Sequence, residues 1–302
     1  MPWCCLGRRQ QIFNPHESIL REVLRVNGCC TLASTVLAAL SSLLCPCAAL
    51  HDDHTKQELV ESLSTWGLPH AVGTRGSAGM RNASCSNLMD SGLLIVSSVA
   101  PVKSGFIPYS ATGVEGAAHK GWLWALLPPV DTDKVEGKAH GDGPAGGGGQ
   151  LIITTHQHAD QPNFATPGAV RAEQRAELLA GLHRLRAELA PSVVVVCGDL
   201  NEEAHERADG AGLCADFRAA GLVRLTACSR AAGTCIKDDG SGRVQELDHI
   251  YAAGPGVARL AYEPQLPLRT PHSDHSLLWV TGIRMPVGDT ESQGADTVTE
   301  LV

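Results

Sequence analysis

The chain contains the stretch Ser192-Val-Val-Val-Val-Cys-Gly-Asp199-Leu-Asn201, in which an apolar run leads directly into an acid and an amide. A short apolar run with polar residues at its end predicts a strand that is buried on both faces. Side chains at positions i and i+2 of an extended segment point to the same side, so Asp199 and Asn201 are expected to converge beyond the strand's end. Their oxygens could hold a cation and a phosphate there. An ordinary turn closed by the Asp199 side chain is the competing interpretation.

Three further segments place polar side chains at the ends of predicted strands. Gln150-Leu-Ile-Ile-Thr-Thr155-His156 ends an apolar run on a histidine, and Thr270-Pro-His272-Ser-Asp274-His275 leads into the apolar residues that follow it. Glu246-Leu-Asp248-His-Ile-Tyr251 carries an acid inside a short strand. Each histidine alone is more typical of a capping or surface residue. It is the set of four segments that favours one site.

These four motifs resemble the endonuclease/exonuclease/phosphatase superfamily, which includes pancreatic deoxyribonuclease. The family pattern is Asn-Thr-His, Gly-Asp-Leu/Phe-Asn, Asp-Tyr-Ile/Val-Phe and Ser-Asp-His, in that order, and Thr154 stands where the family has the first asparagine. The likeness covers roughly residues 50–284. It implies an α/β fold, a four-layer α/β sandwich in which two packed mixed β-sheets are flanked by helices.

Two segments are similar to the neutral sphingomyelinase branch of that superfamily. The run from Asp90 to Ser98, followed by Pro101-Val, looks like the branch's Asp-Gly-Gly-Leu-x-Ile-x-Ser segment, and His119-Lys120-Gly121 looks like the start of its Lys-Gly-Val-Leu strand. The resemblance implies a metal-dependent phosphodiesterase that hydrolyses sphingomyelin to ceramide and phosphocholine. The implied cofactor is Mg²⁺, with Mn²⁺ as an alternative, and the implied partner is phospholipid at a membrane surface.

The resemblance also implies a role for each site residue. His275 would take a proton from the attacking water, and Asp248 would orient it by accepting its other N–H. His156, paired with Asp90, would bind a phosphoryl oxygen or act as the acid. The implied metal ligands are Asp199, which also counts among the catalytic residues, Asn201, Asp274 and Asn14. The implied substrate-binding residues are Asn201, His156 and Lys120. His158, His249 and His272 match no family position and are expected to be structural.

One element of the family pattern is absent. The family's principal metal ligand is a glutamate in a Gln-Glu pair, and Ala48-Ala49 occupies that position when the chain is aligned back from the helix that follows. Asp52, Asp53 or Glu58 could replace it. Without a replacement the chain would be a catalytically impaired relative that binds phospholipid or phosphate. A nuclease or an inositol phosphate phosphatase is a further alternative.

Composition sets limits on these alternatives. The 302 residues suit one large sandwich domain, and with 43% apolar but only 4% aromatic residues the core must consist mainly of Val, Leu and Ala. The formal net charge of −8 argues mildly against nucleic acid as the main ligand. Among the 11 cysteines, Cys228 and Cys235 could close a small loop in an oxidising compartment, whereas Cys197 fits a small buried hydrophobe.

The chain divides into four parts. Residues 1–28 form a polar N-terminal segment, and residues 29–50 form an uncharged segment that suits a membrane span, a signal sequence, or a buried helix or strand. Residues 51–284 form the endonuclease/exonuclease/phosphatase-like domain, and residues 285–302 form an acidic tail that is expected to be disordered. Membrane association or entry into the secretory pathway is therefore expected, with a cytoplasmic location as the alternative.

Hydrophobic periodicity predicts the main elements of the domain. An amphipathic helix is expected at 54–66, and a longer one at 171–189, where leucines recur at helical spacing. A third helix is expected near 214–220. The expected strands are 92–97, 121–127, 151–155, 193–197, 244–251 and 277–281, and the glycine-rich residues 136–150 are expected to form a hairpin tip.

Overall fold

The computed structural model of the chain describes residues 38–39, 53–73, 91–113, 120–129, 148–160, 166–203, 212–225, 233–236, 242–254 and 275. Its centre is a six-stranded sheet in the order β4-β5-β6-β7-β11-β8. The strands are β4 (Lys103–Pro108), β5 (Gly121–Leu127), β6 (Gln150–His156), β7 (Val193–Asp199), β11 (Asp248–Ala253) and β8 (Val223–Arg224). The β6–β7 pair is parallel and the other pairs are antiparallel, so this sheet is mixed.

Strand β7 follows from the apolar run that opens the decisive motif. All its residues from Val193 to Asp199 are buried, as expected for a central strand covered on both faces. Helix α4 (Pro167–Leu189) provides the crossover that a parallel β6–β7 pair requires. The glycine-rich residues join β5 to β6, which are antiparallel neighbours. The carboxyl ends of β6 and β7 therefore meet at one edge of the sheet.

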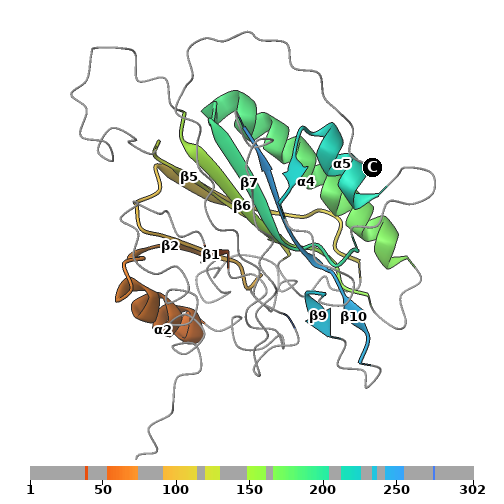
Figure 1. Cartoon of the computed structure of the whole chain (residues 1–302), viewed down its shortest axis with the longest axis horizontal. Coiled ribbons are helices and arrows are strands. Elements are labelled where there is room, and N and C mark those ends of the chain that lie inside the picture. Colours follow the sequence, from red (N-terminus) through yellow and green to blue (C-terminus); the bar gives the residue numbers. More distant parts are fainter. Residues whose placement is uncertain are drawn as a thin grey trace, which may run out of the picture.

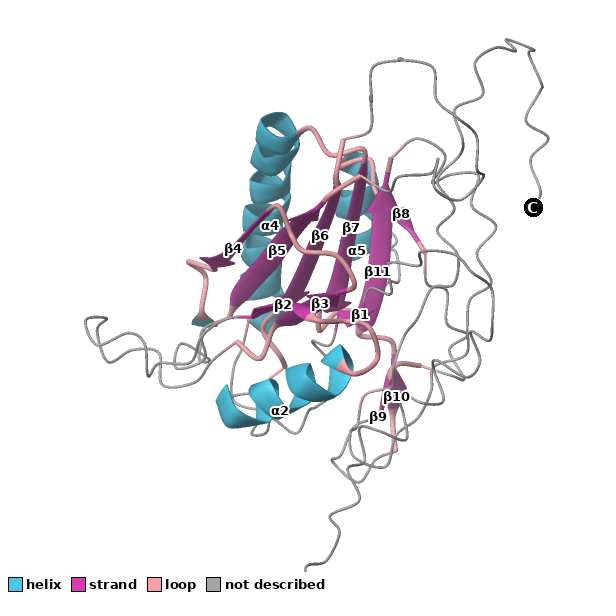
Figure 2. Ribbon diagram, turned by 90° about the vertical axis from the view of Figure 1, so that its left-hand side faces the viewer, coloured by secondary structure: helices cyan, strands magenta, loops and turns pink. Residues whose placement is uncertain are grey.

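Two helices cover one face of this sheet (Figure 2), namely α4 and the shorter α5 (Leu213–Ala219). The predicted leucine stripe of α4 is confirmed, because Leu178, Leu182 and Leu185 are buried in the core on this side. Gly181 allows close packing, since a Cβ at this position would overlap the Trp122 indole. The core beneath the helices is completed by Trp122, Tyr251, Phe217 and neighbouring aliphatic residues.

A smaller sheet covers the opposite face. It has the order β1-β3-β2, and its strands are β1 (Ala38–Ala39), β3 (Leu94–Ser97) and β2 (His70–Gly73), all antiparallel as far as they are described. Leu93 and Ile95 pack against residues of the large sheet such as Ile152 and Val195. Helix α2 (Asp53–Ser64) lies beyond the small sheet (Figure 1) and buries Leu59 and Leu63. The layers are helices, large sheet, small sheet and helix, which confirms the predicted four-layer sandwich.

The prediction of one continuous strand at 244–251 is wrong, because the structure has two strands there. The structure has a short strand β10 (Val244–Gln245), paired with β9 (Cys235–Ile236), and β11 begins only at Asp248. Two backbone N–H groups at the break, those of Leu247 and Asp248, donate to the Thr234 side chain instead of a neighbouring strand. The hydrogen bonds of this segment therefore interrupt the ladder.

Several predicted segments lie outside the described residues. These are the polar segment 1–28, the tail 285–302, the strand 277–281, most of the predicted hairpin tip 136–150, and most of the uncharged segment 29–50, of which Ala38–Ala39 is described as β1. Within the described part of the chain, no helix combines the length and the apolar character that crossing a bilayer requires.

Candidate active site

Three adjacent strands bring acids and a histidine to the same edge of the large sheet. His156 ends β6 and Asp199 ends β7, and the parallel register places these two residues opposite each other. Asp248 begins β11 and lies opposite Asp199 in the antiparallel pair on the other side. The order across the sheet is therefore His156, Asp199, Asp248.

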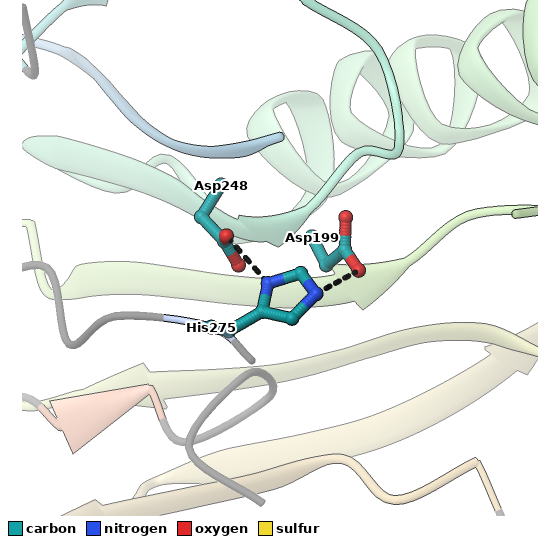
Figure 3. A group of neighbouring side chains, drawn as sticks. All are labelled: Asp199, Asp248 and His275. Atoms are coloured by element: carbon teal, nitrogen blue, oxygen red, sulfur yellow. Dashed lines mark hydrogen bonds and ion pairs between the residues drawn. The ribbon is translucent and has the colours of Figure 1, made fainter. Parts of the chain in front are cut away.

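His275 lies between the two carboxylates (Figure 3). Its Nδ1 is 2.7 Å from Asp248 Oδ2, and its Nε2 is 3.8 Å from Asp199 Oδ2. The first contact is a hydrogen bond in which the imidazole N–H donates to the carboxylate, which leaves Nε2 directed toward Asp199. All three side chains are buried. The predicted orienting contact between Asp248 and His275 is thus present in the geometry.

His156 approaches the same carboxylate from the other side. Its Nε2 is 3.6 Å from Asp199 Oδ2, so Asp199 faces two imidazoles. The His156 side chain is 24% exposed, whereas those of Asp199 and His275 are each 7% exposed. Of these three residues, His156 is the one that opens the cluster to solvent.

Asn201 reaches the cluster through a turn. Its φ is +51°, in the left-handed region, and its backbone N–H donates to Asp199 Oδ1 at 2.8 Å. The expectation that the two side chains converge from an extended segment is therefore wrong, because the chain turns immediately after β7. The turn interpretation is confirmed, because the Asp199 side chain closes this turn by accepting the Asn201 backbone N–H.

The Gln157 backbone carbonyl fixes two of the predicted site residues. It accepts hydrogen bonds from Lys120 Nζ at 2.7 Å and from Asn201 Nδ2 at 3.0 Å. Because the amide nitrogen is used in this way, the amide oxygen is the atom that Asn201 can offer to a ligand. Lys120 is buried, and its positive charge favours the ionised form of Asp199. Sequence reasoning missed Gln157 because a backbone carbonyl carries no sequence signature.

Burial and like charge dominate the electrostatics of the cluster. Burial, reinforced by the Asp248 carboxylate, raises the pKa of Asp199 to about 6, against the opposing effects of His275, the Asn201 N–H and Lys120. Burial alone would lower the pKa of His275, but Asp248 and Asp199 outweigh it and raise that pKa above its ordinary value. The two carboxylates thus favour positive charge beside them, which His275 and Lys120 supply and which a cation bound at Asp199 would add to.

The donor set suits a divalent cation. Ligand atoms of Asp199, Asp248 and His275 lie within 4.8 Å of one another, and all three residues are buried. Carboxylate and amide oxygens are the ligands that Mg²⁺ prefers, and this ion retains water or substrate oxygens as further ligands. Asp199 and Asn201 are the residues that would hold it, because His275 is already engaged by Asp248.

The remaining predicted site residues cannot be placed. Asp90, Asp274 and Asn14 lie outside the described residues, as do Ala48 and Ala49. The structure therefore brings together Asp199, Asn201, Asp248, His275 and His156, with Lys120 beside them. Cys235, which could have formed a disulfide with Cys228, is a free, buried thiol.

His249 is buried next to Asp248 but serves the scaffold, as expected for this residue. Its Nε2 is 2.8 Å from the Glu202 carbonyl oxygen, which anchors the turn after Asn201. Burial, together with the nearby Arg224 guanidinium, lowers the pKa of His249 to about 4. The folded protein therefore holds this imidazole neutral at pH values where an exposed histidine would be charged.

This shift makes a prediction about stability and pH. Between pH values of about 6.5 and 4, the unfolded chain binds a proton at His249 that the folded chain cannot, so stability is lost as the pH falls. At pH 4 the loss due to this residue amounts to about 3 kcal/mol. His249→Gln keeps an N–H donor but cannot titrate. Urea unfolding from pH 7 to 4 should therefore show a larger decrease in the free energy of unfolding for the parent than for the variant. Parallel curves of this free energy against pH would contradict the lowered pKa of His249.

Comparison with known proteins confirms the predicted fold. The structure is similar to that of sphingomyelinase C from Streptomyces griseocarneus, with a TM-score of 0.52, 16% identity and 88% of each chain covered. SmcL has a TM-score of 0.52 and 18% identity over 76% of this chain and 81% of its own. Beta toxin from Staphylococcus aureus has a TM-score of 0.52 and 16% identity over 74% and 81%. The chain thus has the α/β sandwich expected from the endonuclease/exonuclease/phosphatase motifs, with a sphingomyelinase among its structural neighbours.

No protein-family model matches the sequence, and no curated protein matches it.

Proposed function

We propose that the chain is a divalent-metal-dependent phosphodiester hydrolase of the neutral sphingomyelinase type, which converts sphingomyelin to ceramide and phosphocholine. The observation that carries this proposal is the cluster in which Asp199 faces the imidazoles of His156 and His275. In this cluster Asp248 lies 2.7 Å from His275 Nδ1. A base with an orienting carboxylate, a second histidine at the solvent side and an acid–amide pair are groups that can catalyse in-line hydrolysis of a phosphodiester.

Each residue has a defined role in the proposed reaction. His275 Nε2 accepts a proton from the attacking water, and the Asp248 carboxylate holds the ring in the required orientation and stabilises its charged form. The new bond joins the water oxygen to phosphorus, and the bond from phosphorus to the ceramide oxygen breaks. His156 donates a proton to that leaving oxygen. A divalent cation held by Asp199 and Asn201 would neutralise charge on the phosphoryl oxygens and offset the Asp199 carboxylate beside His275.

Sphingomyelin is favoured as the substrate by two features. A structural neighbour is named as a sphingomyelinase, and the sequence segments around Asp90 and Lys120 are similar to that branch. The net charge of −8 disfavours nucleic acid. The proposed partner is therefore phospholipid at a membrane surface, with a membrane-associated or secretory location. A catalytically impaired phospholipid-binding relative, and a nuclease or inositol phosphate phosphatase, are the outcomes that the following test distinguishes.

Phosphocholine release from sphingomyelin liposomes, measured during a Mg²⁺ titration, tests the proposal. Release is expected to depend on Mg²⁺, to fall at least about 100-fold in excess EDTA because several kcal/mol of charge stabilisation are lost, and to return when Mg²⁺ or Mn²⁺ is restored. Liposomes of phosphatidylserine provide the headgroup control.

Two results would contradict the proposed activity. If liposomes bind but release no phosphocholine at any metal concentration, the chain is a phospholipid-binding relative. If a supercoiled plasmid or an inositol phosphate is hydrolysed while sphingomyelin is not, the chain is a hydrolase of a different substrate class.

A further inference from the structure

One dipeptide, Thr234-Cys235, contacts both members of the Asp248–His275 pair. Asp248 and His275 are 27 residues apart in the chain, and neither is a sequence neighbour of this dipeptide. Cys235 opens β9, which pairs with β10 just before the chain enters β11. Figure 2 shows β9 and β10 below the end of β11 where Asp248 lies. The β9–β10 pair is thus adjacent to the Asp248–His275 pair.

The Thr234 hydroxyl accepts hydrogen bonds from the backbone at Asp248. Among the described residues, β8 pairs with β11 at Tyr251 and Ala252, away from the start of β11. There, the backbone N–H groups of Leu247 and Asp248 donate to Thr234 Oγ1 at 2.9 and 3.0 Å. Thr234 is fully buried. Buried backbone N–H groups require an acceptor, so this hydroxyl holds the backbone of Asp248 in place.

The next residue holds the other member of the pair. Cys235 and His275 form an antiparallel backbone bridge, and Cys235 is buried. On its other side Cys235 lies opposite Gln245 of β10. The Cys235 side chain also contributes to raising the pKa of His275. Thr234, just before β9, therefore contacts Asp248, and Cys235, the first residue of β9, contacts His275.

The residues around Thr234 are closely packed against β10. The Thr234 N–H donates to the Gln245 carbonyl oxygen at 2.7 Å. Gly233 has a φ of +40°, and a Cβ at this position would overlap the Val244 side chain and lie 2.9 Å from the Gln245 oxygen. The Thr234 hydroxyl is consequently presented from a tightly paired turn.

We propose that Thr234 is a positioning residue: its hydroxyl fixes the backbone at Asp248 so that the carboxylate meets His275 Nδ1. Thr234 does not touch the substrate, and it acts on catalysis only through this pair. The catalytic consequence rests on the proposed function, whereas the positioning itself is a property of the fold. Nothing in the sequence around Thr234 indicates this role.

Three substitutions separate the hydroxyl from the rest of the side chain. Thr234→Val keeps the shape but removes the acceptor, Thr234→Ser keeps the acceptor, and Thr234→Ala removes both the hydroxyl and the methyl group. For the hydrolysis of sphingomyelin, kcat is expected to fall about 10- to 100-fold in the Val and Ala variants, with KM changed by less than about 2-fold. The Ser variant should regain most of kcat. Ile236→Ala, at an exposed position of β9 two residues further on, is the control and should leave kcat unchanged.

A second measurement does not depend on activity. The proton of the His275 Nδ1–H···Asp248 hydrogen bond should give a downfield NMR resonance, which is assigned by its loss in His275→Ala. It is expected in the parent and in Thr234→Ser, and it should vanish or broaden in the Val and Ala variants. If Thr234→Val does not fold, the Ser and Ala variants provide the same comparison.

The outcomes distinguish the two proposals. If the parent protein hydrolyses no phosphodiester, the proposed function fails, and the NMR resonance alone decides whether Thr234 positions the pair. Unchanged kcat and an unchanged resonance in Thr234→Val would overturn the inference. So would a Ser variant as impaired as the Val variant, because the hydroxyl would then not be the cause.

Discussion

His275→Ala is expected to lower kcat for sphingomyelin hydrolysis by about 10³-fold or more, because general-base catalysis typically contributes 10²- to 10⁴-fold. The residue is buried between two carboxylates, and its Nε2 is directed toward Asp199. Asp248→Asn should produce a loss of similar size, since an amide can stabilise neither the charged imidazole nor the required tautomer. Steady-state kinetics with saturating Mg²⁺ measures both effects.

The control for this prediction is His183→Ala. His183 is exposed on α4, and α4 covers the face of the large sheet, whereas the catalytic cluster lies at the ends of its strands. Its replacement should leave kcat within about 2-fold of the parent, as is usual for exposed positions. If His275→Ala retained a tenth or more of the parental kcat, His275 could not be the base.

Gly198→Ala is expected to destabilise the protein by about 3 kcal/mol or more. Gly198 has a φ of +137°, which side chains rarely adopt, and a Cβ would overlap the Thr155 carbonyl oxygen and lie 3.0 Å from the Thr155 nitrogen. Strain in such a conformation and overpacking contribute about 1–3 kcal/mol each. Because Gly198 immediately precedes Asp199, phosphocholine release should fall as well. Urea unfolding monitored by circular dichroism measures the loss of stability.

Gly221→Ala separates strain from overlap. Gly221 also has a positive φ, of +74°, but no atom lies within 4 Å of a Cβ placed there. Gly221→Ala should therefore destabilise the protein only by the cost of a left-handed backbone conformation, about 1 kcal/mol. Equal losses in the two variants would show that the close approach of β6 and β7 at Gly198 does not constrain the site.

The central part of the fold could be predicted because its signals are local. The apolar run that forms β7 and the leucine spacing of α4 each determine an element without reference to the rest of the chain. The short strands β8 and β9 were not predicted, since two residues carry no periodicity and form a strand only through pairing with distant partners. The partly exposed edge strand β4 was missed as well, and it ends at Pro108, a residue typical of edge strands.

Part of the cluster at the strand ends could be predicted from the sequence, but its geometry could not. The ordered motifs identified Asp199, Asp248 and His275, which lie together in the structure. They did not indicate that Asn201 turns back toward Asp199 in the left-handed conformation. Nor did they indicate Thr234, because a hydroxyl that accepts backbone N–H groups from a segment distant in the sequence leaves no pattern.

A crystal structure of the protein with Mn²⁺ and phosphate, collected at the manganese absorption edge, tests the central claim most directly. If the strand ends form one phosphodiesterase site, the bound Mn²⁺ should give an anomalous peak in contact with Asp199 and Asn201. The phosphate should lie between that peak and the imidazoles of His156 and His275. An anomalous peak elsewhere, or phosphate bound away from these two histidines, would contradict the claim.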